Sequence, residues 1–223
     1  MTARTESHAA RLDRALQAPS SSARLQAALT AGTSPDQAFI PVLIARCAVE
    51  PDFFVRDMLT WALTRQDSAI SVDLLVQELT SSEPQARSQA LHTLSKIGDA
   101  RAATAITPSL LHDDDPEVAR AAWRAAAGLA PVAQHHDLAR ELIGELGRGD
   151  LALQRSLSRA IALLGDAGTA AAAAAEDHPD PEVRAHALAT RHLIESPEDD
   201  FAAAVAEAER VVALRAAPPV EQD

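Results

Sequence analysis

Aromatic residues are scarce in this chain of 223 residues, which has four Phe, two Trp and no Tyr. A β-sandwich or β-barrel needs β-branched and aromatic side chains to fill its pleated faces, so the composition disfavours an all-β fold. Only eight residues are Gly, which excludes a collagen-like chain. Ala and Leu, the strongest helix formers, are abundant instead, with 50 and 26 residues. Since 47% of the residues are hydrophobic and can bury a core, we expect an ordered, all-α protein.

Cysteine and long apolar runs are also missing. The single cysteine, Cys47, excludes a disulfide framework and a zinc site built from cysteines. It lies in the apolar run from Ile40 to Cys47, so we expect a buried side chain rather than a nucleophile. No window approaches 18 continuous apolar residues, which predicts no membrane span. The polar residues 1–6 are not followed by an apolar stretch of signal-peptide length, so we expect a cytoplasmic protein.

Positive charge is in deficit, with 20 Lys and Arg against 32 Asp and Glu, and the net charge is −12. A protein that coats DNA or RNA needs a basic face to neutralise phosphates, so nucleic acid is disfavoured as a partner. An anionic membrane surface is disfavoured for the same reason. The charge permits a basic partner.

An acidic residue followed by proline recurs along the chain, and each copy opens an Ala- and Leu-rich helical stretch. The clearest copies are Glu83-Pro84-Gln85-Ala86-Arg87, Asp115-Pro116-Glu117-Val118 and Asp180-Pro181-Glu182-Val183-Arg184, with looser ones at Glu50-Pro51 and Asp150-Leu151. An arginine recurs with a similar period, at Arg24, Arg56, Arg87, Arg120, Arg155 and Arg184. We expect each of these arginines to pair with an acidic loop residue or a carbonyl of the neighbouring unit.

Each unit is predicted to form two helices. Asp180 suits an N-cap and Pro181 the first helical position, where the missing N–H costs nothing. A Gly-Asp pair, as at Gly98-Asp99, ends the first helix. The second helices carry apolar stripes, such as Val72, Leu75, Val76 and Leu79, or Ala139, Leu142, Ile143 and Leu146. In the first unit we expect the capping box Ser34-Pro35-Asp36-Gln37 to open the second helix.

The Asp-Pro-Glu-Val-Arg opening, the Gly-Asp break and the period of about 32 residues resemble HEAT repeats of the short bacterial type. One helical hairpin cannot bury its apolar face alone, whereas stacked hairpins can. The resemblance implies a right-handed α-solenoid of about six hairpins over residues 20–215, with units starting near 20, 50, 83, 115, 150 and 180. We expect a capping helix in residues 1–19 and a disordered tail in residues 216–223.

Some HEAT-repeat families are enzymes, and their motifs are absent here. Deoxyhypusine hydroxylases hold two irons with repeated His-Glu dipeptides, and this sequence contains no His-Glu dipeptide. HEAT-like alkylpurine DNA glycosylases rely on a basic groove, which the net charge of −12 disfavours. HEAT-repeat bilin lyases also exist, but no residue points specifically to them. The sequence has no Gly-x-Ser-x-Gly motif, and Gly144–Gly149 lacks the Lys-Ser/Thr pair of a phosphate-binding loop.

Two groups of residues have side chains of the kind that bind metals. In His112-Asp113-Asp114-Asp115 the favoured interpretation is a helix end, a short loop and an N-cap. In His135-His136-Asp137 it is a solvated helix start, because a zinc site needs a third ligand. We therefore expect no catalytic residue, no metal and no cofactor. The alternatives are an enzyme or a small-molecule or metal binder with a pocket in the concave groove, using His135 or His136, and a DNA-repair-type HEAT module.

Acidic residues mark the predicted second helices. In HEAT stacks these helices usually line the concave side, which the resemblance implies here. Asp137, Glu141 and Glu145 recur at intervals of four residues, opposite the apolar stripe, and Asp73, Gln77 and Glu78 occupy the matching face of an earlier unit. They form either an ordinary solvated face or an acidic groove that receives a basic peptide or protein segment.

The few aromatic residues cluster early in the chain. Phe53, Phe54 and Trp61 form either an anchor for a partner or ordinary packing between the first and second units. Trp123 aligns with core leucines of other units, so we expect it to be buried. The leading hypothesis from the sequence is a non-enzymatic scaffold that binds another protein through a concave, acidic face.

Overall fold

The computed structural model describes residues 7–216, which form helices and loops without any strand. The first hairpins and the capping helix comprise α1 (His8–Leu16), α2 (Ser21–Thr33), η1 (Gln37–Phe39), α3 (Ile40–Val49), α4 (Phe53–Thr64) and α5 (Ser68–Glu78). The middle of the chain comprises α6 (Pro84–Ile97), η2 (Ala100–Ala105), α7 (Pro108–Leu111), α8 (Pro116–Leu129), η3 (Val132–Gln134) and α9 (His135–Ile143). The last hairpins comprise α10 (Leu151–Leu163), α11 (Asp166–Ala174), η4 (Ala175–Asp177), α12 (Pro181–Glu195) and α13 (Phe201–Ala216). The predicted all-α fold of helical hairpins is confirmed.

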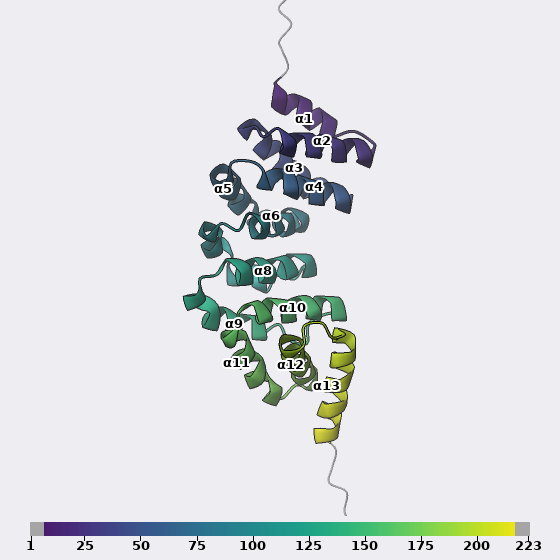
Figure 1. The fold of residues 1–223 in the computed structure, drawn as a ribbon, viewed down its shortest axis with the longest axis vertical. Helices are drawn as coiled ribbons and strands as arrows, with labels where there is room; N and C mark the ends of the chain where they lie inside the picture. Colours follow the sequence, from purple (N-terminus) through teal and green to yellow (C-terminus); the bar gives the residue numbers. More distant parts are fainter. Residues whose placement is uncertain (1–6, 217–223) are drawn as a thin grey trace, which may run out of the picture. The chain divides into compact units, whose positions relative to one another are not determined.

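The chain divides into two compact units, one up to Ala125 and one from Ala126 onward. In the first unit α4 packs between α2 and α6, and these helices follow one another along one side, with α3 and α5 on the other (Figure 1). Large leucines fill the space between the two rows, and Leu43, Leu59, Leu63 and Leu91 are completely buried. Each hairpin therefore hides the apolar face of the next, as the repeat pattern predicts.

Helix ends follow local chemistry. Asp52 caps α4, because its carboxylate accepts hydrogen bonds from the backbone N–H groups of Phe54 and Val55. Gly98 ends α6 in the left-handed conformation, with φ of 74°. The predicted capping box at residues 34–37 is wrong in detail. Asp36 accepts the hydrogen bond from Ala38 and opens η1, and α3 begins only at Ile40.

The second helix of the third hairpin departs from the pattern. Residues Ala100–Ala105 form the 3₁₀ helix η2, and only Pro108–Leu111 form the short helix α7. Pro108 explains the break, since it lacks an N–H and disfavours helical conformation in the residue before it. Thr107 is extended accordingly, with φ of −84° and ψ of 160°.

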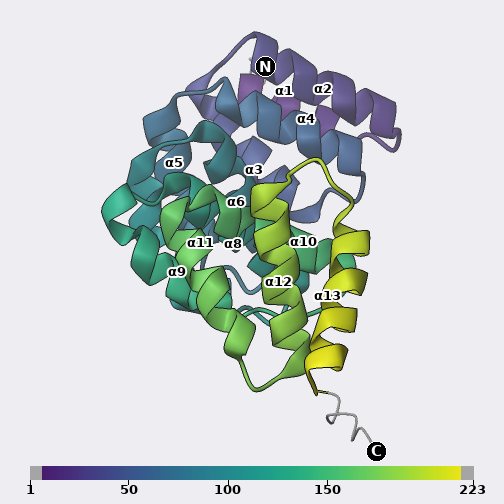
Figure 2. The same ribbon diagram turned by 60° about the horizontal axis from the view of Figure 1, so that its bottom comes forward.

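In the second unit α11 packs against α9, while α12 packs against both α10 and α11. The last helix does not join the row of second helices. It lies along α12, on the side away from α11, in both views (Figures 1 and 2). Small residues allow this close approach, because Ala185 and Ala189 of α12 meet Phe201, Val205 and other buried residues of α13. The predicted tail, apart from Ala216, lies outside the described residues.

The recurring arginine has a structural role at several positions. Arg24, Arg56, Arg87 and Arg184 each donate hydrogen bonds to two carbonyls of the loop that leads into their own helix. Arg24 and Arg87 also make two hydrogen bonds each to a carboxylate that lies 26 residues later, in Glu50 and Asp113 respectively. We call these two contacts the carboxylate clips. Arg120 instead pairs with Glu117 of its own helix, and Arg155 is exposed.

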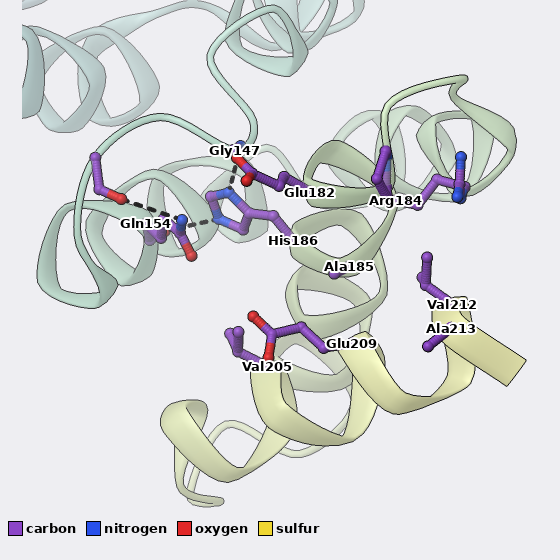
Figure 3. Close-up of a pocket in the computed structure, with 12 residues that line it drawn as sticks. Gly147, Gln154, Glu182, Arg184, Ala185, His186, Val205, Glu209, Val212 and Ala213 are labelled. Carbon is purple, nitrogen blue, oxygen red and sulfur yellow. Dashed lines mark hydrogen bonds between the residues drawn. The ribbon is translucent and has the colours of Figure 1, made fainter.

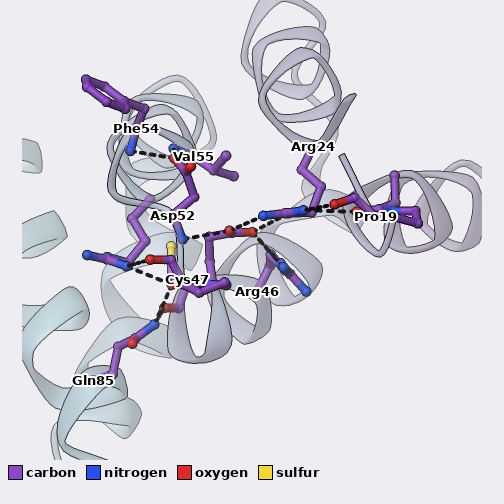
Figure 4. A network of polar contacts seen from close by, with 12 residues as sticks. Pro19, Arg24, Arg46, Cys47, Asp52, Phe54, Val55 and Gln85 are labelled. Atoms are coloured by element: carbon purple, nitrogen blue, oxygen red, sulfur yellow. Dashed lines mark hydrogen bonds and ion pairs between the residues drawn. The ribbon is translucent and has the colours of Figure 1, made fainter. Parts of the chain in front are cut away.

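Glu50 is the centre of the first carboxylate clip and is completely buried. Figure 4 shows the polar network that contains this clip, with Arg24, Arg46 and Asp52. Its carboxylate also accepts hydrogen bonds from Arg46 and from the backbone N–H of Asp52, while its carbonyl accepts from Arg56 and Gln85. Burial alone would raise the pKa of the Glu50 carboxyl, but the hydrogen bonds from Arg24, Asp52 and Arg46 lower it to about 2. Three hairpins therefore meet at one residue, whose carboxylate binds the first two and whose backbone carbonyl binds the third.

Candidate functional site

Two of the three predicted aromatic anchors stand in solvent at the start of α4. Phe53 and Phe54 are 65% and 71% exposed. Their rings meet edge to face with centroids 5.6 Å apart, and the guanidinium of Arg56 lies 6.0 Å from the Phe53 centroid. Large aromatic side chains are costly to leave in water, so this pair, which we call the aromatic patch, is a candidate contact surface.

Trp61 serves packing more than contact. Its ring covers Gly32 of α2 so closely that a Cβ added at Gly32 would lie 2.3 Å from the ring. The indole therefore holds α2 against α4, and 38% of the residue remains exposed. Trp123 is completely buried, as predicted, and its indole N–H donates to the carbonyl of Leu111 over 2.8 Å.

A cavity of about 300 Å³ opens beside the aromatic patch and runs across α4, α6 and α8. We call it the arginine trough, because Arg56, Arg120 and Arg124 line it together with Phe53. Ser88 and Ala121 are also among its lining residues. Asp57, Gln89, His92 and Glu117 complete the lining.

The charges in the arginine trough are only partly balanced. Arg120 pairs with Glu117. Arg56 donates to two backbone carbonyls, and Arg124 has a contact of 3.3 Å with Nδ1 of His92. Burial lowers the pKa of His92, and the nearby Arg124 lowers it further. A neutral imidazole can accept a hydrogen bond from Arg124, so His92 helps to hold that guanidinium in place.

The predicted acidic residues have mixed surroundings. On α5, Asp73 and Gln77 are exposed, and Asp73 lies 3.9 Å from Arg101, which makes a closer contact with Asp99. Glu78 is half-buried.

On α9, Asp137 and Glu141 are exposed, and Asp137 pairs with Arg140. Glu145 does not belong to the predicted exposed stripe, because α9 ends at Ile143 and the turn that follows buries the side chain beside Arg148. Arginines thus neutralise part of the predicted acidic face.

The second unit contains a cavity of about 530 Å³ between the start of α10, α12 and α13 (Figure 3). His186 in its wall is 1% exposed. Its Nδ1 accepts a hydrogen bond from the backbone N–H of Gly147, and its Nε2 contacts the carbonyl of Gln154 at 3.1 Å and Ser158 at 3.0 Å. Burial lowers the pKa of His186 to about 4. Because its ring nitrogens have partners within the protein, the imidazole acts as a structural link between α10 and α12.

No group of three or more metal-binding side chains occurs within residues 7–216. Asp113 binds Arg87. Asp115 caps α8, because its carboxylate accepts hydrogen bonds from the backbone N–H groups of Glu117 and Val118. His135 contacts the carbonyl of Ala130, while His136 is exposed. Burial raises the pKa of the Cys47 thiol to about 12, which opposes thiolate chemistry. In the described part of the chain, no helix is long and apolar enough to cross a membrane.

The arginine trough was missed from the sequence, although a signal for it existed. The six helices that open the hairpins (α2, α4, α6, α8, α10 and α12) carry ten Arg and Lys against four Asp and Glu. The helices that close the hairpins carry four Arg and Lys against seven Asp and Glu; these helices are α3, α5, α7, α9, α11 and α13. A charge count made helix by helix would have located the positive charge that the net value of −12 conceals.

Comparison with known proteins identifies the repeat. Residues 55–128 match the family model of HEAT repeats. Curated proteins give no match to the sequence. Among solved structures, the complex of CpcE and CpcF of phycocyanin lyase from Nostoc sp. PCC7120 is 19% identical with a TM-score of 0.40, covering 90% of this chain and 93% of that one. Human deoxyhypusine hydroxylase in complex with glycerol is 18% identical with a TM-score of 0.44, and the match covers 91% of this chain and 93% of the hydroxylase chain.

Both structural likenesses have TM-scores below 0.5 and do not bear on the function of this chain. The family match is a match of sequence to a repeat model. It covers α6 and nearly all of α4 and α8, together with the helices between them. The chain therefore contains HEAT repeats, which confirms the family resemblance over residues 55–128.

Proposed function

We propose that this protein is a non-enzymatic HEAT-repeat scaffold that binds another protein, with the aromatic patch of Phe53 and Phe54 as its main contact. The exposure of both rings supports the proposal. Aromatic side chains contribute much of the binding energy of protein interfaces once a partner removes them from water. A rigid helix presents them, so little conformational entropy is lost on binding.

The acidic residues of the second helices form a second candidate surface, for a basic segment of a partner. Asp73 and Gln77 on α5 support it, because both are exposed and the ion pair of Asp73 with Arg101 is long, at 3.9 Å. Asp137 is paired and Glu145 is buried, which weakens the surface on α9. The aromatic patch is therefore the stronger of the two candidates.

Site-specific photocrosslinking in cells of the source organism tests both surfaces. A photoreactive phenylalanine analogue is placed at Phe54 for the aromatic patch and at Gln77 for the acidic surface. Leu163 of α10 is a matched control, because it is apolar and 59% exposed but lies outside both surfaces. We expect one discrete protein adduct from position 54 and none from position 163.

The yield at position 54 should fall when Phe53 is also changed to Ser, since the neighbouring ring is part of the same contact. An adduct from position 77 instead would assign the interface to the acidic surface. If neither position gives an adduct above the yield at position 163, the protein-binding function is wrong.

A further inference from the structure

We infer that the arginine trough binds a carboxylate side chain in an acidic segment of the partner. The inference rests on the proposed function, since it describes the chemistry of the partner at the same surface. Neither Arg56 nor Arg124 forms an ion pair with a described residue. Two guanidiniums without a carboxylate partner therefore line one cavity, in a chain whose net charge is −12.

The balance of charge favours a carboxylate over a phosphate. Arg56, Arg120 and Arg124 face the cavity with Asp57 and Glu117, so the lining has a surplus of one positive charge when His92 is neutral. A single carboxylate cancels this surplus. A dianionic phosphate would meet uncompensated repulsion from the two acidic residues. The planar guanidinium of Arg124 also matches a carboxylate in bidentate geometry.

The neighbouring groups favour a peptide over a free acid. Phe53 lines the arginine trough and also belongs to the aromatic patch, so the anion site continues into an apolar one. A volume of about 300 Å³ lies at the small end for binding pockets and suits one or two side chains. A segment with an acidic residue next to an apolar one would fill both parts.

Binding of labelled peptides to the full-length protein tests the inference. The probe is a short fluorescein-labelled peptide in which Glu and Phe alternate, followed by fluorescence anisotropy near neutral pH. We expect Arg124→Gln to weaken binding roughly tenfold, the usual effect of losing one charge-assisted pair. Arg159→Gln is the matched control, because Arg159 is an exposed arginine of α10 outside the trough, and its effect should stay within about twofold.

A second variant strengthens binding, a result that misfolding cannot produce. Asp57→Asn removes a negative charge from the lining and should tighten the peptide about threefold at low salt. The inference is overturned if Arg124→Gln and Arg159→Gln weaken binding equally, or if a peptide of Lys and Phe binds as well as the acidic one. It is also overturned if inorganic phosphate binds more tightly than the peptide. A crosslink from position 54 that survives Arg124→Gln unchanged would leave the proposed function intact and reject only this site.

Discussion

The arginine that opens each hairpin has a role set by the residues around it. Arg87 is the clearest case, because its guanidinium ties the carbonyls of Ser81 and Ser82 to the carboxylate of Asp113. Both charged side chains are largely buried, at 16% and 14% exposure. Arg155 holds the same place in the repeat and is exposed. Position in the repeat alone therefore does not decide whether the arginine stabilises the fold.

This difference gives a direct stability test. Arg87→Ala removes the clip and leaves Asp113 without this cation, so we expect a loss of about 2 kcal/mol and a Tm lower by roughly 5 °C. Arg155→Ala serves as control and should leave the Tm unchanged within about 1 °C, as for other exposed charges. Thermal unfolding followed by circular dichroism measures both. Equal melting of the two variants would mean that the clip does not stabilise the fold.

His186 predicts how stability changes with pH. Its folded pKa of about 4 lies below the ordinary value of 6.5, so the unfolded chain binds the proton more readily. The stabilisation is complete above pH 6.5 and is lost as the pH falls toward 4, by about 3 kcal/mol in all. Urea unfolding at pH 7 and pH 4.5 measures the loss.

His186→Gln removes the titration, so its stability should depend less on pH over this range. His136→Gln, at an exposed position, should behave like the parent protein. An unchanged pH dependence in His186→Gln would show that another group controls acid unfolding.

At the scale of the element, packing distance decides what a helix tolerates. Gly168 of α11 lies so close to α10 that an added Cβ would be 2.0 Å from the carbonyl oxygen of Ile161. Gly128 of α8 has no atom within 4 Å of such a Cβ. The same substitution should therefore have opposite effects at the two positions.

Gly168→Ala should destabilise the protein by about 2 kcal/mol, since the clash with backbone outweighs the better helix propensity of Ala. Gly128→Ala should stabilise it by up to about 1 kcal/mol, because only the propensity changes. The free energy of unfolding in urea distinguishes them. A stabilising Gly168→Ala would mean that α11 can move away from α10 at little cost.

The sequence predicted helix starts better than helix partners. Asp180 caps α12 and Gly98 ends α6 as expected, because caps depend on residues a few positions away. The break before Pro108 was also readable from local chemistry but was not predicted. The position of α13 was not readable in this way. Its place depends on packing against residues far away in the fold, such as Ala185 and Ala189 of α12, and not on local chemistry.

At the scale of the whole molecule, the repeat could be recognised from its period, but the candidate site could not. The arginine trough combines Arg56, His92 and Arg124 from three successive hairpins, and these residues are 36 and 32 positions apart in the sequence. Their meeting depends on the register in which hairpins stack, which a single unit does not reveal. The aromatic patch was one of two alternatives from the sequence, and it could be considered because its residues are adjacent in the chain. The burial of Glu145 was missed because the turn after α9 was not foreseen.

Repeats that contact only their neighbours should also lose stability locally. In Gly168→Ala we expect faster amide hydrogen exchange in α10 and α11, while the exchange rates in α2 and α4 stay within about twofold of the parent protein. Mass spectrometry of peptides from each helix measures this. Uniform acceleration in all helices would mean that the chain unfolds as a single cooperative block.

The carboxylate clips also limit where the chain tolerates added length. Arg24 and Glu50, like Arg87 and Asp113, are joined across a span of 26 residues. One residue inserted inside either hairpin should therefore move the carboxylate away from the guanidinium that binds it. The hairpin between them lacks such a clip, because Ser82 occupies the place equivalent to the acid after Arg56. The buried Gln66 holds the turn from α4 to α5 instead, because it donates to the carbonyl of Ala31 and accepts from the backbone N–H of Asp36. A loop graft or affinity tag in this turn should therefore leave Gln66 in place.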